Sequence, residues 1–98
     1  MPEKEAIELV KNNENQRYEI HVDGKRVGFI EYKRDVDVME LIHTVVDRAH
    51  RGKGYAQQLA DFALGDIRDT GLIVRPTCSF IASHIEQNPE YGTLVAAE

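Results

Sequence analysis

The sequence has few of the features that mark a secreted, membrane-embedded or metal-binding protein. Its one cysteine, Cys78, excludes an internal disulfide and suits a reducing compartment. No apolar run approaches the length of a membrane span, and residues 1–4 do not begin a signal peptide. The four histidines lack metal-ligand spacing, so no zinc site is expected. These absences predict a cytoplasmic protein without a bound metal.

Positive charge is also scarce. Twelve Lys and Arg residues stand against 17 Asp and Glu, for a net charge of −5. This balance argues against general affinity for nucleic acid or an anionic membrane, and it would tolerate a cationic substrate. The 98 residues leave room for one domain, residues 1–98, with a modest core. The chain shows no internal repeat, linker or low-complexity segment.

The first half of the chain has the two-residue periodicity of half-buried strands. Asp23-Gly24 follows the alternating residues 18–22 and is the strongest short hairpin signal in the sequence. The expected strands are a short edge strand before residue 11, then residues 18–22, 26–33 and 36–46. In the return strand 26–33, alternation places Val27 and Phe29 on one face, and a turn is expected at Arg34-Asp35. These segments predict an antiparallel meander.

The second half changes period. Apolar residues at helical spacing predict a helix that begins near Gly54 and ends at Gly71; they are Ala56, Leu59, Ala60, Ala63 and Ile67. The apolar run 72–74, which Pro76 closes, fits a strand over residues 72–75 that is covered on both faces and parallel to residues 36–46. Thr77 is the expected cap of a second helix over residues 78–87. The predicted fold class is α/β (α+β), a meander continuing into a β-α-β unit and a C-terminal helix.

Residues 43–56 are the most informative stretch, because an apolar strand there runs into a basic, glycine-punctuated helix start. Free N–H groups and the dipole at a helix N-terminus favour phosphate. Gly52 and Gly54 would let a ligand approach the backbone, and Arg51 and Lys53 add positive charge. A Walker A loop would need Ser or Thr after Lys53, and a dinucleotide fingerprint would need Gly or Ala at position 57. The stretch predicts a phosphorylated cofactor; an ordinary surface turn is the alternative.

The pattern Arg51-x-x-Gly54-x-Ala56 resembles the (Gln/Arg)-x-x-Gly-x-(Gly/Ala) motif of the GCN5-related N-acetyltransferases. Together with His43-Thr44-x-Val46, Pro76-x-Cys78-Ser79-Phe80 and Asn88-Pro89-x-Tyr91, it is similar to the minimal acetyltransferases of the YjdJ type over about residues 31–95. The resemblance implies a reduced form of that fold, without the paired helices that follow the first strand in larger members. It also implies acetyl-CoA as co-substrate.

The expected activity is acetyl transfer to an amine, which could belong to a protein lysine, a polyamine or another small molecule. Neither a nucleic acid nor a membrane is an expected partner. The alternative function, from another class, is an acyl-CoA-binding or adaptor module with little catalytic turnover.

The resemblance also implies roles for individual positions. Backbone groups of Thr44, Val45 and Val46 would bind the pantetheine arm, in a slot where two parallel strands splay apart. The turn would hold the pyrophosphate, through Arg51, Gly52, Lys53, Gly54, Tyr55 and Ala56. Glu40 stands eleven residues before Arg51, where histone-type relatives have their general base. His84 stands near the position at which many larger members carry a tyrosine acid, so the acid is left unassigned.

Cys78 decides between two chemical routes. A helix N-terminus stabilises a thiolate and would make Cys78 a candidate nucleophile, although a lone cysteine is more often a small apolar filler. The resemblance implies that it lies beside the acetyl group. Acetyl transfer can then run directly, with a base that takes the amine proton, or through an acyl-cysteine. We favour direct transfer, because the amine must lose a proton in either route and the carboxylate of Glu40 already stands at the position of the family's base.

The other candidate side chains each have a structural alternative. Glu40, expected to share a face with Val38, Ile42 and Val46, is either a carboxylate with a raised pKa or a residue at the sheet margin. His43 either orients the turn through a backbone hydrogen bond or transfers a proton. Surface positions are expected for His21 and His50. The expected core aromatics are Tyr18, Phe29, Tyr32 and Phe62, whereas Tyr55 and Tyr91 could wall the cofactor slot.

Overall fold

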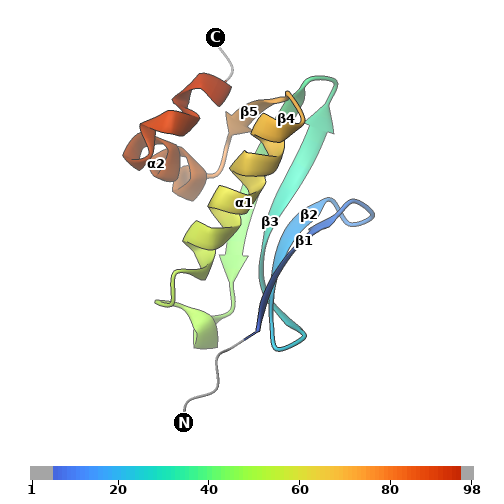
Figure 1. The fold of residues 1–98 in the computed structure, drawn as a ribbon, viewed down its shortest axis with the longest axis vertical. Helices are drawn as coiled ribbons and strands as arrows, with labels where there is room; N and C mark the ends of the chain where they lie inside the picture. Colours follow the sequence, from blue (N-terminus) through green and yellow to red (C-terminus); the bar gives the residue numbers. More distant parts are fainter. Residues whose placement is uncertain (1–5, 96–98) are drawn as a thin grey trace.

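The computed structural model of this chain describes residues 6–95, which form a five-stranded sheet in the order β1-β2-β3-β4-β5 with α1 lying across one face (Figure 1). The strands are β1 (Ile7–Asn12), β2 (Arg17–Val22), β3 (Lys25–Asp35), β4 (Val38–Val46) and β5 (Ile73–Pro76). The helices are η1 (Arg48–His50), α1 (Tyr55–Asp69), α2 (Ser79–Gln87) and η2 (Pro89–Leu94), of which η1 and η2 are 3₁₀ helices. Strands β1 to β4 are antiparallel and β5 is parallel to β4, which confirms the predicted fold class.

Two tight turns connect the central strands. Asp23 and Gly24 have φ values of 52° and 83°, the left-handed pair that a two-residue type I′ hairpin requires. The turn between β3 and β4 lies at Val36 and Asp37, because Asp35 still pairs with Val38. The prediction of a turn at Arg34-Asp35 is therefore wrong by two residues.

A β-bulge changes the faces of β3. The register between β2 and β3 shifts at Val27, an extra residue that turns toward the core together with Ile30. Phe29 lies on the opposite face, where the guanidinium groups of Arg17 and Arg26 are each 5.4 Å from its ring centroid. The predictions that Val27 and Phe29 share a face and that Phe29 is a core residue are wrong, because simple alternation does not anticipate a bulge.

The same open face carries a buried carboxylate, Glu19, which is 5% exposed. It accepts hydrogen bonds from Asn12 Nδ2 and Arg17 Nε at 3.1 and 3.0 Å, and His21 Nε2 lies 2.9 Å away. Burial tends to raise the pKa of Glu19, but its bonds to His21, Arg17 and Asn12 outweigh this and lower the pKa. His21 thus lies on the predicted face but belongs to this cluster, and is only half-exposed.

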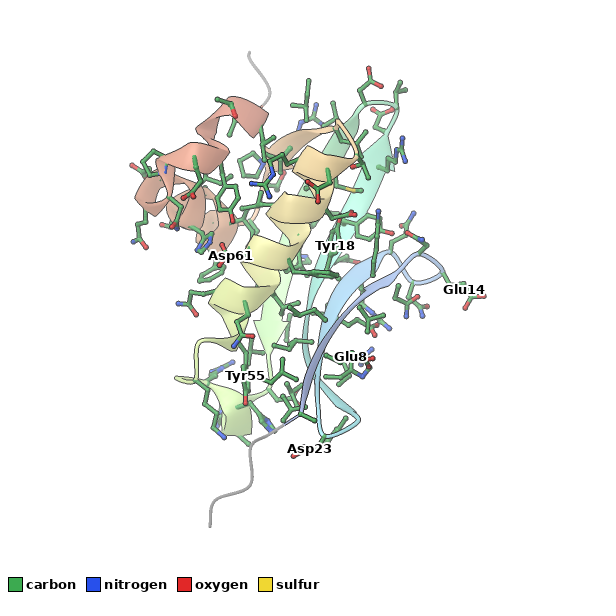
Figure 2. The ribbon with its side chains drawn as sticks, in the orientation of Figure 1. Glu8, Glu14, Tyr18, Asp23, Tyr55 and Asp61 are labelled. Atoms are coloured by element: carbon green, nitrogen blue, oxygen red, sulfur yellow. The ribbon has the colours of Figure 1, made fainter. Side chains whose placement is uncertain are left out.

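The core lies between α1 and the sheet. Tyr18, labelled in Figure 2 between the sheet and α1, donates a 2.7 Å hydrogen bond to Asp66 of α1, and Lys11 binds the same carboxylate at 2.8 Å. Burial, then the bond to Asp66, raises the pKa of Tyr18. The fully buried apolar residues of this layer include Ile20, Ile30, Leu41, Leu59, Ala60, Ala63, Leu64, Ile67, Val74 and Ile81.

The end of α1 places β5. Gly71 has φ 75°, Leu72 N–H donates to Ile67 at 3.0 Å and Gly71 N–H to Arg68 at 3.1 Å, the pattern of a Schellman motif. The prediction that Gly71 ends this helix is confirmed. In β5, however, only one face is covered, since Ile73 is 40% exposed. The expectation of a strand covered on both faces is wrong because α1 covers only one face of the sheet (Figure 1).

None of the helices in the described part of the chain is long and apolar enough to cross a membrane.

Candidate functional site

Strands β4 and β5 separate halfway along β4. They pair from Val38 with Ile73 to Leu41 with Pro76, and a 2.9 Å hydrogen bond from Cys78 N–H to Leu41 O follows. The chain then enters α2, so residues 42–46 have no strand partner on that side within residues 6–95. This leaves one edge of β4 open.

A second β-bulge decides which side chains face that opening. The register between β3 and β4 shifts by one residue at Ile42. Beyond the bulge Thr44 and Val46 lie on the α1 side of the sheet, whereas Glu40 and His43 lie on the opposite, open face. The prediction that Glu40 and Val46 share a face is wrong for this reason.

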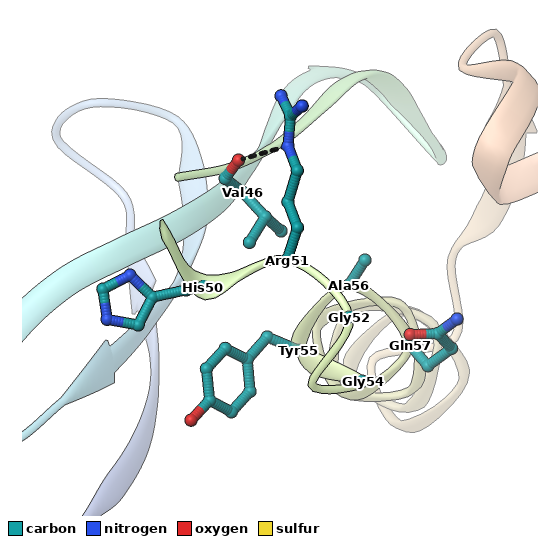
Figure 3. A pocket seen from close by; sticks show the side chains of 8 residues that line it. All are labelled: Val46, His50, Arg51, Gly52, Gly54, Tyr55, Ala56 and Gln57. Carbon is teal, nitrogen blue, oxygen red and sulfur yellow. Dashed lines mark hydrogen bonds between the residues drawn. The ribbon is translucent and has the colours of Figure 1, made fainter. Parts of the chain in front are cut away.

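The turn after β4 forms a hollow at the start of α1 (Figure 3). Gly52 and Gly54 have φ values of 80° and 79°, and Gly54 is the N-cap of α1. Arg51 reaches back along β4, and its Nε donates a 3.3 Å hydrogen bond to Val46 O. The hollow, of about 370 Å³, is lined by Val46, His50, Arg51, Gly52, Gly54, Tyr55, Ala56 and Gln57. Lys53 is exposed and does not line it.

A second hollow continues along the open edge of β4. It is lined by Thr44, Val45, Val46, Arg51, Ala56 and Phe80. The two hollows share Val46, Arg51 and Ala56, so they adjoin. We refer to both together as the β4 groove; it runs from the glycine turn to the first turn of α2.

Cys78 stands where the groove meets α2. It is the N-cap of α2, and its Sγ lies 3.4 Å from Thr44 Oγ1. Burial tends to raise the pKa of the Cys78 thiol. The bond with Thr44, with the backbone groups of Ile81, Phe80 and Thr44, outweighs burial and lowers the pKa. The lowered pKa favours the thiolate form of Cys78, at one end of the groove, more than in a free cysteine.

The two other predicted catalytic residues lie on the open face of the sheet. Glu40 is half-buried and accepts a hydrogen bond from the hydroxyl of Thr77. Thr77 therefore binds Glu40 and does not cap α2, which corrects the predicted cap. His43 is 68% exposed, and its Nε2 lies 4.0 Å from Glu31 Oε1. It lies within β4 beside Glu31, away from the turn that it was expected to orient.

His84, near the expected position of the acid, belongs to a packed cluster. Its Nε2 lies 2.8 Å from Asp61 Oδ1, and Tyr91 donates a 2.9 Å bond to the same oxygen. Its ring stacks between those of Phe80 and Tyr91, with centroids 6.1 and 6.0 Å away. Burial, then the bond to Asp61, raises the pKa of Tyr91 to about 12. Tyr91 therefore ties η2 to α1 and does not line the groove.

Three groove residues were not assigned by the sequence: His50, Gln57 and Phe80. His50 was expected on the surface, but it is half-buried, and its Nδ1 is a buried atom without a hydrogen-bond partner among the described residues. Its ring centroid lies 6.3 Å from that of Tyr55, which is buried and lines the hollow as expected. Phe80 follows the candidate residue Cys78 by two positions, and this proximity in the sequence could have suggested that it lines the groove.

No group of three or more His, Cys, Asp or Glu side chains within residues 6–95 could hold a metal ion.

The comparison of this sequence with family profiles decides its family. The profile described as GCN5-related N-acetyl-transferase matches residues 17–94. The chain belongs to this family. Among curated relatives, this acetyltransferase-family chain is 32% identical over 88 residues to Protein NATD1 of Gallus gallus, an alignment that covers 85% of this chain and 77% of the relative. Protein NATD1 of Homo sapiens is equally similar, with 75% of its length covered.

Solved structures show the same fold. The ribosomal-protein-S18-alanine N-acetyltransferase from Escherichia coli matches with a TM-score of 0.63 at 15% identity, covering 80% of this chain and 54% of that one. Ard1 from Thermoplasma volcanium matches with a TM-score of 0.55 at 24% identity, covering 79% and 54%. This member of the acetyltransferase family thus spans about half the length of those two structures. Its finer resemblance to the YjdJ type stays a prediction.

Proposed function

We propose that this chain is an N-acetyltransferase that uses acetyl-CoA as donor and an amine as acceptor. The observation that carries the proposal is the β4 groove, which connects a glycine turn at a helix N-terminus with the Thr44–Cys78 pair. A phosphate-bearing ligand with a long flexible arm has the shape and chemistry to follow this path. We also propose that residues 1–98 act as a single domain and work in the cytoplasm.

The residues present fit the cofactor. A Cβ at Gly52 or Gly54 would meet no atom within 4 Å, so the turn is open to an approaching phosphate. Arg51 lines both hollows and would add charge-assisted hydrogen bonds to the pyrophosphate. The unpartnered Nδ1 of His50 beside the first hollow is a further polar group that a ligand could satisfy after a small movement. The backbone of Thr44, Val45 and Val46 would bind the pantetheine arm, with Lys53, Tyr55 and Ala56 completing the turn.

Acetyl-CoA supplies the acetyl group as an activated thioester. In direct transfer, Glu40 would take a proton from an amine that approaches from the open face of the sheet. The C–N bond would form as the C–S bond breaks, and the proton would pass through solvent to the CoA thiolate, which would leave as the thiol. In the alternative route, the Cys78 thiolate accepts the acetyl group and then passes it to the amine. His43 lies on the same face as Glu40 and is a candidate to relay a proton. We favour direct transfer.

The acceptor is a protein lysine, a polyamine or another small amine. The net charge of −5 would tolerate a cationic acceptor. The E. coli structure is named for a ribosomal-protein alanine, so peptides with a free N-terminal amine belong beside lysine peptides in the substrate panel.

Steady release of CoA from acetyl-CoA tests the proposal, with a panel of lysine peptides, N-terminal alanine peptides and polyamines. Calorimetry with CoA should show binding, and at least one amine should raise CoA release above the rate without amine. Binding without amine-dependent release would support the alternative, an acyl-CoA-binding or adaptor module. Absence of CoA binding by the folded protein would refute both functions.

A further inference from the structure

We propose that Phe80 closes the acyl end of the β4 groove and restricts the donor to short acyl thioesters. The inference rests on the proposed function, since it assigns the acyl group of the donor to one end of the groove. It adds a specificity-determining residue that is neither part of the glycine turn nor one of the candidate catalytic groups.

Phe80 lies at the end of the β4 groove that is far from the glycine turn. The second hollow has Arg51 and Ala56 at the end nearest the glycine turn, and Phe80 is the one lining residue that α2 contributes. Thr44, which also lines this hollow, bonds to Cys78, two residues before Phe80. A ligand whose phosphates bind at the turn would therefore bring its far end to Phe80.

The side chains packed behind Phe80 hold its ring in place. Its ring stacks on His84 with an interplanar angle of 27°, and His84 stacks on Tyr91 at the same angle. His84 is 7% exposed, and both it and Tyr91 bind Asp61, which Figure 2 labels on α1. Rotation of Phe80 away from the groove would break this stack. The stack therefore holds the half-buried ring of Phe80 in place, and a longer acyl chain at this end of the groove would meet that ring.

Calorimetry with CoA, acetyl-CoA and hexanoyl-CoA tests the inference by binding alone. The wild type should bind hexanoyl-CoA at least about tenfold more weakly than acetyl-CoA, a discrimination that a well-packed pocket achieves. Phe80→Ala should remove the wall and raise the ratio of hexanoyl to acetyl affinity by about fourfold for each methylene it newly buries. His84→Gln keeps a partner for Asp61 but removes the stacked ring, so it should raise the ratio less.

Phe62→Leu is the matched control, because Phe62 packs edge-on against Tyr18 at 5.8 Å and does not line the groove. It should leave the ratio unchanged. Equal affinity of the wild type for the two thioesters would overturn the inference even if Phe80→Ala failed to fold, and so would an unchanged ratio in a folded Phe80→Ala. If the wild type does not bind CoA at all, the proposed function itself is refuted.

Discussion

The role of Arg51 as a phosphate ligand can be tested by removing its side chain. Arg51 is held against β4 by its bond to Val46 O, and it lines both hollows of the β4 groove. Arg51→Ala should leave the fold intact, because this residue is exposed and lies outside the core. It should weaken binding of CoA but not binding of pantetheine, which has no phosphate.

The size of the effect follows from the exposure of this side chain. A hydrogen bond to a charged group contributes about 1.5 to 3 kcal/mol, and solvent screening reduces that value for an exposed group. We therefore expect a loss of about 1 to 2 kcal/mol, which is roughly a 5- to 30-fold weaker affinity for CoA. Higher salt should shrink the difference between wild type and variant, since screening acts on the same interaction.

Titration calorimetry with CoA and with pantetheine measures both affinities. Arg68→Ala is the control, because Arg68 is another exposed arginine but lies in the last turn of α1, away from the groove. Arg51→Lys should recover part of the affinity, since it keeps the charge but loses the planar fork. Equal affinity of the wild type for CoA and pantetheine would refute a phosphate site at Arg51 and the glycine turn.

Three further changes test other parts of the structure. Gly54→Val should lower the unfolding free energy by about 1 to 2 kcal/mol, because its φ of 79° strains a branched side chain, and should abolish CoA binding; thermal melts and calorimetry check both. In kinetic assays Glu40→Gln should lower the turnover rate by roughly 10²- to 10⁴-fold, whereas Cys78→Ala should lower it little. An acetyl adduct on Cys78 that forms and discharges at the turnover rate would instead establish the acyl-cysteine route. Glu19→Gln should cost about 1 to 3 kcal/mol at neutral pH. Because folding lowers the pKa of Glu19, its carboxylate stabilises the fold fully above the pKa that it has in the unfolded chain, and this stabilisation is lost as pH falls through the pKa in the folded protein. In denaturant titrations, the difference in stability between wild type and Glu19→Gln should therefore vanish in acid. A difference that stays constant with pH would contradict this prediction.

Features fixed by short-range chemistry could be predicted from the sequence. Asp23-Gly24 forms the expected hairpin because two consecutive left-handed residues suit that pair. The apolar stripe gives α1, and Gly71 ends it because glycine accepts the left-handed conformation of the Schellman motif. The glycine turn at residues 51–56 follows the same logic, since its conformation depends on the local backbone. Its role toward CoA stays a prediction.

Tertiary structure alone decided which side chains meet. The bulges at Val27 and Ile42 each add one residue, which reverses the alternation beyond them and separates Glu40 from Thr44. The pairing register with a neighbouring strand sets a bulge, and alternation within one strand carries no record of it. Phe80 and His84 are i, i+4 neighbours within α2, so their stack is local. The bond of His84 to Asp61 of α1 and its stack on Tyr91 of η2 depend instead on how the three helices dock. Local chemistry thus determined the turn at one end of the groove, and packing between distant segments determined how the wall at the other end is anchored.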